Sequence, residues 1–143
     1  MFAAAIGAES HFTKTVSESD VYLFAGVTGD LSPSHVDEAF MRTTPYGGRI
    51  AHGALLVGYM SNCSTTIVAK CGVLADSHFP VSLGYDKVRF LEGVRIGDTI
   101  TITYRIQLAD AAKARTLAAV EVRRGDGVLC AVASHLMTWL PKF

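Results

Sequence analysis

The sequence predicts a single-domain α+β protein in which an antiparallel sheet of about five strands wraps one long central helix. Three observations support this fold class. The chain has 143 residues, a length that usually forms one domain with one core, so residues 1–143 are expected to be a single unit. Its longest periodic segment, residues 53–69, is apolar over most of its circumference, which is typical of a buried helix. After Gly72 the sequence changes to alternating apolar positions rich in β-branched residues, which favour strands.

The N-terminal part is predicted to hold one strand and one helix. Residues 11–16 form the strand. Ser17 or Ser19 is expected to cap the helix, because a hydroxyl at this position accepts a hydrogen bond from an N–H group of the first turn. The helix is expected to make about two turns and to end at Gly26 or Gly29.

Residues 30–35, Asp-Leu-Ser-Pro-Ser-His, are dense in turn-forming residues and are expected to form a loop. Pro33 supports this expectation because it biases Ser32 away from helical dihedral angles. A short helix over residues 37–42 is predicted next. A proline and two glycines within residues 45–48 then break the chain before the long helix.

Four strands are predicted after the long helix, and together with the N-terminal strand they make the sheet. The turn signals are Gly97-Asp98 and Gly125-Asp126-Gly127, of which the second is typical of a hairpin. Short turns join neighbouring strands in antiparallel fashion, so the sheet is antiparallel and packs on the helix. The four predicted strands cover residues 79–85, 99–108, 116–123 and 128–140.

Composition limits the partners of this protein. Hydrophobic residues make up 50% of the chain and the mean hydropathy is +0.30, so a second subunit is expected to cover part of the apolar surface, in a homodimer or a dimer of dimers. Thirteen Lys and Arg residues balance thirteen Asp and Glu residues, and no basic run is present to follow a phosphate backbone. Nucleic acid is therefore not an expected partner.

A cytoplasmic location is expected. No apolar run reaches membrane-spanning length, and residues 1–6 lack the features of a secretory signal. The cysteines, Cys63, Cys71 and Cys130, are odd in number and lack the paired spacing of a zinc site or a disulfide framework. We expect reduced, mostly buried thiols, no membrane partner and no metal.

Asp30 and His35 are the first candidates for chemistry. A carboxylate and an imidazole within reach of one water make a general base and acid, and the proline turn between them can direct both side chains to one point. The alternative is structural, with Asp30 capping the turn and His35 capping the next short helix. The spacing by itself does not decide between them.

Gly53 marks a second candidate, because it begins the long helix, where backbone N–H groups of the first turn have no partner. Such N–H groups can bind a carbonyl oxygen that becomes negative in a transition state, and glycine lets a ligand approach closely. The alternative is that Gly53 only eases close packing. His52, just before it, is interpreted as a satisfied buried histidine, with direct contact to substrate as the second possibility.

The segment Gly29-Asp30-Leu31-Ser32-Pro33-Ser34-His35-Val36-Asp37 resembles the D-x-N-P-x-H-x-D motif of MaoC-like (R)-specific enoyl-CoA hydratases. The segment Ile50-Ala51-His52-Gly53-Ala54-Leu55-Leu56 is similar to the start of the central helix in that family, which has the hot-dog fold. The similarity continues through Leu83-Gly84 and Phe90 to Gly97-Asp98, and so covers most of the chain in the expected order.

This resemblance implies roles for particular residues. Asp30 and His35, called the dyad below, would activate water, and the Gly53 N–H would bind the thioester carbonyl. Ser61 matches a family position whose hydroxyl lies near the dyad, although a hydroxyl that bonds back to its own helix is an equal alternative. The implied reaction is addition of water to a trans-2-enoyl-CoA thioester. It needs no cofactor besides the coenzyme A thioester of the substrate.

Two residues depart from the family pattern. Ser32 stands where the motif usually has asparagine, and Gly93 stands where many members have proline. A hydroxyl offers fewer fixed hydrogen bonds than an amide, so Ser32 bears on how firmly the loop holds the dyad and on the substrate. Neither departure removes a reacting group.

Two other functions remain as alternatives. A hot-dog acyl-CoA thioesterase often uses a carboxylate on the central helix, but no Asp or Glu lies between Gly53 and Ala69. A non-catalytic acyl-CoA-binding subunit is the other alternative, suggested by Ser32 and by the short chain.

Overall fold

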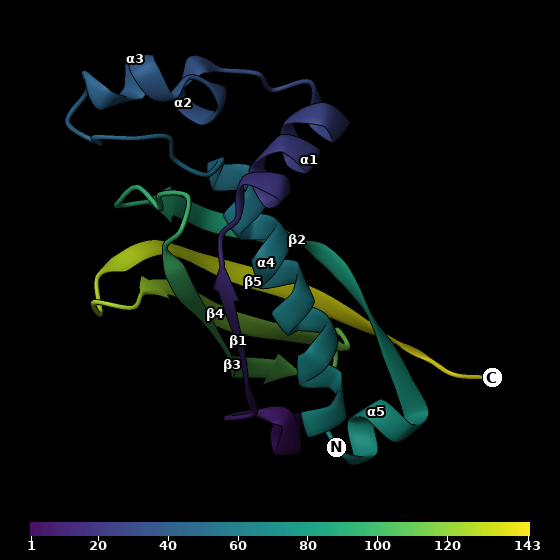
Figure 1. Ribbon diagram of the computed structural model, residues 1–143. Helices are drawn as coiled ribbons and strands as arrows, with labels where there is room; N and C mark the ends of the chain where they lie inside the picture. The colour runs from purple at the N-terminus through teal and green to yellow at the C-terminus, as the bar shows by residue number, and fades with distance from the viewer.

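The computed structural model describes residues 1–143 and shows a five-stranded antiparallel sheet wrapped around a central helix (Figure 1). The strand order β1-β3-β4-β5-β2 places β1 and β2 at the two edges of the sheet. The strands are β1 (Glu9–Thr15), β2 (His78–Phe90), β3 (Thr99–Asp110), β4 (Arg115–Arg124) and β5 (Leu129–Pro141). The α+β architecture expected from the sequence is confirmed.

Helix α4 (Gly53–Thr66) packs one of its faces against the sheet and continues into the short 3-10 helix η2 (Ile67–Lys70). Its buried positions are Leu55, Leu56, Met60 and Cys63. Alternate residues of β3, such as Ile102 and Tyr104, are fully buried beneath the helix. The opposite face of α4, which includes Ser61, is exposed. The expectation of a buried helix is therefore correct for one face of α4 only, because a single sheet covers one side.

Helix α1 (Glu18–Thr28) begins with a capping box that identifies Ser17 as the cap. The Ser17 Oγ accepts a hydrogen bond from the Asp20 N–H at 3.2 Å, and the Asp20 carboxylate accepts one from the Ser17 N–H at 2.9 Å. The helix has 11 residues and is longer than predicted. Gly26 lies inside it, and the chain leaves the helix only at Gly29, which has a φ of +78°.

Two further short helices follow α1. Helix α2 (Pro33–Val36) has Ser32 as its N-cap, so the predicted loop over residues 30–35 is wrong in its second half. Pro33 disfavours a helical conformation for the residue before it, but it also starts a helix well. Helix α3 (Glu38–Arg42) agrees closely with the prediction. Figure 1 shows α1, α2 and α3 together at one end of the molecule, beyond the N-terminal end of α4; we call residues 18–42 the helical arm.

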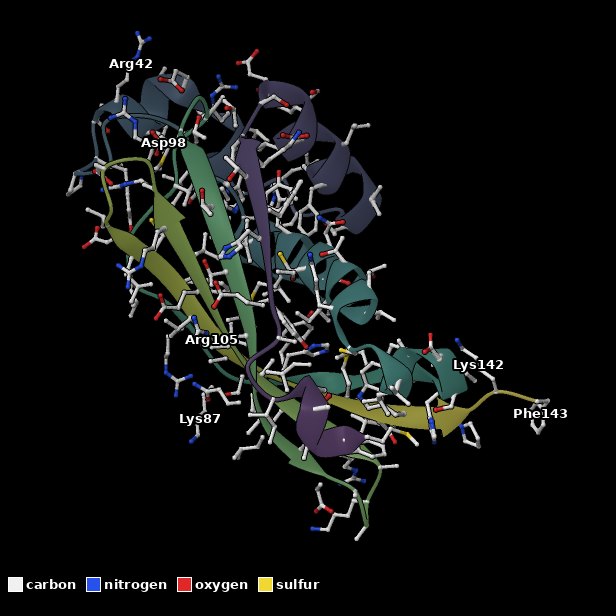
Figure 2. The ribbon with its side chains drawn as sticks, turned by 90° about the horizontal axis from the view of Figure 1, so that it is seen from below. Arg42, Lys87, Asp98, Arg105, Lys142 and Phe143 are labelled. Atoms are coloured by element: carbon white, nitrogen blue, oxygen red, sulfur yellow. The ribbon has the colours of Figure 1, made fainter.

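Strand β2 continues beyond the predicted end at Tyr85. Its pairing with β5 shifts register twice, and Lys87, with a φ of 52°, lies in the second irregularity and points into solvent (Figure 2). Helix α5 (Val73–Ser77) precedes β2, and the 3-10 helix η1 (Phe2–Ala5) lies near the start of the chain. Both are too short to show a helical period in the sequence, and neither was predicted.

The three cysteines are buried and form no disulfide, as expected. Burial raises the pKa of each thiol, which keeps it protonated. None of the helices is both long and apolar enough to span a membrane.

Candidate active site

Asp30, His35 and His52 meet at the N-terminal end of α4. The His35 Nε2 lies 3.8 Å from the Asp30 Oδ2, and the His52 Nε2 lies 4.0 Å from the same oxygen. Asp30 follows α1, His35 lies in α2 and His52 is the N-cap of α4, so three elements contribute to one cluster. The structure thus brings the predicted dyad together, while its catalytic role stays a prediction.

One hydrogen bond defines the tautomer of His35. Its Nδ1 lies 2.7 Å from the Ile50 carbonyl oxygen, which can only accept, so Nδ1 carries a proton. In the neutral ring, Nε2 then has the lone pair and faces the Asp30 carboxylate. The separation of 3.8 Å is too long for a direct hydrogen bond and suits a bridging water. His35 can therefore accept a proton from a water through Nε2.

The Asp30 carboxylate is oriented by its own turn. Its Oδ1 accepts a hydrogen bond from the Ser32 N–H at 3.3 Å, and the Asp30 N–H donates to the Thr28 Oγ1 at 3.2 Å. The Ser32 hydroxyl instead caps α2, where it accepts from the Ser34 N–H. Because the Asp30 contact uses the backbone of Ser32, serine in place of the motif asparagine leaves the carboxylate oriented.

His52 is almost completely buried but is satisfied at only one nitrogen. Its Nε2–H donates to the Asp30 carbonyl oxygen at 3.0 Å, whereas Nδ1 has no hydrogen-bond partner. The ring stacks on His35, with 3.6 Å between ring centroids. The interpretation as a satisfied buried histidine is therefore correct for one nitrogen, and the ring contacts both members of the dyad.

The first turn of α4 offers free N–H groups, as predicted. Neither Gly53 nor Ala54 donates its N–H to a backbone acceptor. The Phe90 ring lies against Gly53, where an added β-carbon would be 2.5 Å from the Phe90 Cε2. The close-packing role of Gly53 is confirmed by this contact. Its role as a donor to a substrate carbonyl stays a prediction.

A pocket of about 240 Å³ connects His35 with Gly53. Most of its wall is apolar and comes from the segment before α4, from Leu56 of α4, from Phe90 at the end of β2 and from the loop after β2, which includes Val94. A carbonyl held at Gly53 would therefore share one cavity with the His35 ring. An apolar cavity with a few polar groups on one side is typical of a binding site for a small organic molecule.

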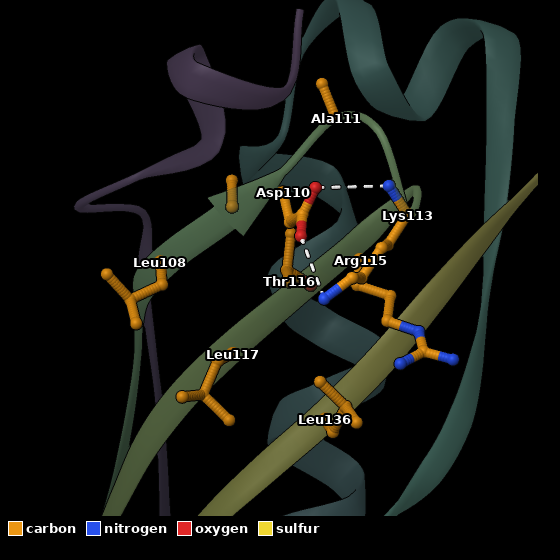
Figure 3. A pocket seen from close by; sticks show the side chains of 9 residues that line it. Leu108, Asp110, Ala111, Lys113, Arg115, Thr116, Leu117 and Leu136 are labelled. Carbon is orange, nitrogen blue, oxygen red and sulfur yellow. Dashed lines mark hydrogen bonds and ion pairs between the residues drawn. The ribbon is translucent and has the colours of Figure 1, made fainter.

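A larger hollow of about 570 Å³ lies where β3 connects to β4 (Figure 3). It is lined by Leu108, Leu117 and Leu136 and carries an ion pair between Asp110 and Lys113 at 3.7 Å. Its lining contains no histidine, the side chain that exchanges protons near neutral pH. It also contains no helix N-terminus whose free N–H groups could bind a carbonyl oxygen. The smaller pocket is therefore the candidate active site.

Ser61 lies on the exposed face of α4, two helical turns beyond Gly53, and the structure does not bring it to the dyad. It lines a groove of about 460 Å³ between α4 and β2, together with Ser64, Thr65 and Ser82. Its hydroxyl makes no hydrogen bond back to the helix, so that alternative is wrong, whereas the Ser61 carbonyl accepts from the Ser64 hydroxyl.

Arg49 connects the helical arm to the segment before α4. Its Nε donates to the Glu38 Oε2 at 2.8 Å, its Nη1 donates to the Tyr22 hydroxyl at 2.7 Å, and its Nη2 pairs with Glu18. The hydrogen bonds with Glu18 and Glu38 raise the pKa of Arg49, and those from Arg49 lower the pKa of Glu38. These partners are 11, 27 and 31 residues away, so no local sequence signal identifies them.

Asp30, His35 and His52 also form a group that could hold a metal ion. One ligand atom from each of Asp30, His35 and His52 lies within 4.8 Å of the others. The His52 nitrogen that lies 4.0 Å from the Asp30 carboxylate is Nε2, which already donates to a carbonyl oxygen, so only Asp30 and His35 present free ligand atoms to each other, where catalytic zinc sites use three ligands. The absence of a bound metal stays a prediction.

Gly93 has a packing reason for its departure from the family pattern. A β-carbon at this position would lie 2.9 Å from the Tyr46 ring, and the Gly93 carbonyl accepts a hydrogen bond from the Arg124 Nη1. A proline ring would overlap Tyr46. The small residue therefore permits the aromatic wall of the pocket.

Residues 1–127 match the family described as MaoC like domain. The chain belongs to this family. An (R)-specific enoyl-CoA hydratase of Rhodospirillum rubrum is 38% identical over 100 residues, which are 70% of this MaoC-like chain and 64%, less than two thirds, of that relative. A 3-hydroxybutyryl-CoA dehydratase of Methylorubrum extorquens is 32% identical over 124 residues, which are 87% of this chain and 74% of the relative.

The solved structure of an (R)-hydratase from A. caviae involved in PHA biosynthesis aligns with a TM-score of 0.82. The alignment covers 95% of this MaoC-like chain and 96% of that protein, at 24% sequence identity. Similarity at this level of identity shows the fold, and the predicted hot-dog fold is confirmed.

Proposed function

We propose that this protein is an (R)-specific enoyl-CoA hydratase, a hydro-lyase that adds water to a trans-2-enoyl-CoA thioester and catalyses the reverse dehydration. One observation carries the proposal: the Asp30–His35 pair and the free N–H groups at Gly53 flank the same end of α4, and His35 and Gly53 line one pocket. The names of the two relatives, a hydratase and a dehydratase of CoA thioesters, support it.

The geometry suggests how water is added. A water between Asp30 and His35 donates one hydrogen to the carboxylate and gives the other proton to the His35 Nε2. Its oxygen forms a bond to Cβ of the substrate, and the electron pair of the carbon–carbon double bond moves onto Cα and the thioester oxygen. The Gly53 N–H stabilises that negative oxygen, and the His35 Nε2–H then protonates Cα. One water is consumed, and no net proton is gained or lost.

The proposed reaction needs no metal or redox cofactor, because the thioester of the substrate already polarises the reacting carbons. The ligand implied is an acyl-CoA. We further place the protein in the cytoplasm, where the three free cysteines would remain reduced.

We also infer that the protein works as a homodimer or a dimer of dimers. Strand β2 is a 13-residue edge strand whose outer side has no partner, and long edge strands tend to pair. The exposed face of α4, with Gly58 and Ser61, lies next to this edge. Light scattering tests this inference, and a monomer at micromolar concentration would contradict it.

Two other activities remain as outcomes of the test. A hot-dog thioesterase often uses a carboxylate on the central helix, and α4 has no Asp or Glu. A non-catalytic acyl-CoA-binding subunit was suggested by Ser32, but the orientation of Asp30 depends on the Ser32 backbone and not on its side chain.

The experiment follows the loss of crotonyl-CoA absorbance with the wild-type protein and with Asp30→Asn and His35→Ala. Each variant is expected to lose at least roughly 100-fold in rate with the fold intact, as for removal of a general acid or base. Asp86→Asn and His11→Ala, exposed residues outside this cluster, serve as matched controls. Thiol release from acyl-CoA would indicate a thioesterase instead. Binding of acyl-CoA without either reaction would indicate a binding subunit.

A further inference from the structure

We propose that His52 is a positioning residue, which aligns Asp30 and His35 with each other while making no contact with substrate or water. This inference rests on the proposed function and assigns a different role to a residue first considered for substrate binding. The ring is only 2% exposed, and it does not line the pocket that contains His35 and Gly53.

The first contact of His52 holds the backbone of Asp30. The His52 Nε2–H donates to the Asp30 carbonyl oxygen at 3.0 Å, and this bond links residues 22 positions apart. Asp30 follows the last residues of α1, where the chain turns toward α2. The bond therefore ties the turn that carries the carboxylate to the start of α4.

The second contact holds the ring of His35. The two imidazoles stack with 3.6 Å between centroids and 25° between planes, and the Phe24 ring packs on His52 at 4.8 Å. His52 thus lies among α1, α2 and α4. The stack and the Ile50 carbonyl together limit rotation of His35, so that its Nε2 stays directed at Asp30.

The hydrogen bonding of His52 fits a positioning role. The Asp30 carbonyl can only accept, so the His52 Nε2 carries the proton and Nδ1 has a buried lone pair with no donor near it. His52 is therefore a hydrogen-bond donor to the Asp30 backbone, and its other nitrogen bonds to neither member of the dyad.

Two variants separate the two contacts. His52→Gln keeps an N–H donor at nearly the position of Nε2 but removes the ring, whereas His52→Phe keeps the ring and removes the donor. Each is expected to lower kcat for crotonyl-CoA roughly 10-fold, and His52→Ala roughly 100-fold, because small misalignments of reacting groups have effects of this size. KM should stay within about threefold, since no substrate contact is removed. His78→Gln, a half-buried histidine of β2 that contacts Phe2, is the matched control and should behave as wild type.

A second readout does not depend on activity. The titration of His35 and its ring tautomer, followed by NMR of the imidazole nitrogens, should change in all three His52 variants and stay unchanged in His78→Gln. If the wild-type protein does not hydrate crotonyl-CoA, the proposed function fails, and the NMR result still decides the role of His52. If His52→Ala does not fold, the glutamine and phenylalanine variants decide. An unchanged His35 titration, or a kcat within about twofold of wild type in folded variants, would overturn the proposal.

Discussion

Acid is expected to destabilise this fold through His135, a completely buried residue of β5. Its Nδ1 and Nε2 lie 2.7 Å from the Tyr104 hydroxyl and 2.8 Å from the Ser82 hydroxyl, and its ring stacks on Tyr85 at 4.1 Å. Both nitrogens are thus satisfied by neutral groups, and no carboxylate is among these partners. Burial lowers the pKa of His135 from 6.5 to about 4, because a charged imidazole would be poorly solvated there.

The sign of the effect follows from proton uptake. Between the two pKa values the unfolded chain binds a proton at His135 and the folded protein does not, so stability falls as the pH falls from about 6.5 towards 4. Between pH 7.5 and pH 4.5 the loss from this residue is roughly 2 to 3 kcal/mol. That is a large part of the free energy of unfolding of an ordinary domain, which is about 5 to 15 kcal/mol.

Urea unfolding at pH 7.5 and pH 4.5, for the wild-type protein and for His135→Gln, measures this quantity. Glutamine is neutral at both pH values, so the variant should lose roughly 2 to 3 kcal/mol less than the wild type on acidification. The comparison cancels the carboxylates, such as Glu38, whose lowered pKa also makes stability fall in acid. Equal losses in the two proteins would show that His135 is protonated in the folded state and would refute the reasoning.

Three other predictions concern the site. Gly53→Ala should displace the Phe90 ring and lower the hydration rate, since its β-carbon would lie 2.5 Å from that ring. A kinetic double-mutant cycle tests the cause: if only packing matters, the double variant Gly53→Ala/Phe90→Ala should be as active as Phe90→Ala. Ser32→Asn should maintain or raise turnover on short enoyl-CoA substrates, because an asparagine side chain can also cap α2. Loss of activity, or a changed preference among acyl groups in steady-state kinetics, would identify Ser32 as a substrate contact. Dialysis against a chelator should leave the hydration rate unchanged, because two free ligands at Asp30 and His35 are too few for a catalytic zinc. Activity that is lost on dialysis and restored by adding a metal ion would contradict this prediction.

The parts of the fold that could be predicted are those with a clear period or a strong local signal. The alternation of β3 and β4 and the apolar pattern of residues 53–69 identified the sheet and the central helix, because the burial of one face imposes a period on each. Helix α2 could not be identified, since Ser32 and Pro33 favour a turn and a helix start equally well. The exposed face of α4 was also missed, because the apolar pattern of a helix does not tell how much of its circumference the sheet covers.

The candidate site was predictable to the extent that its residues are close in the sequence. Asp30 and His35 lie on one turn, so local geometry was enough to bring them together. The acceptor for His35, the Ile50 carbonyl, is 15 residues away, and backbone atoms carry no residue-specific signal. The contact of Phe90 with Gly53 also depends on how β2 crosses the start of α4, which no local pattern describes.

The arrangement of the site explains how a dyad on a separate helical arm can be held in register with a pocket on the hot-dog core. Residues 49–53 supply the connections: Arg49 pairs with the arm, the Ile50 carbonyl binds His35, His52 contacts both dyad residues, and Gly53 offers the free N–H. The groups that position the base and the group proposed to bind the substrate oxygen therefore belong to one continuous stretch of backbone. A shift of the arm that preserves these bonds moves the proposed base and the proposed oxyanion donor together. Substitutions in the sheet should consequently lower stability before they change kcat, whereas substitutions within residues 49–53 should change kcat first.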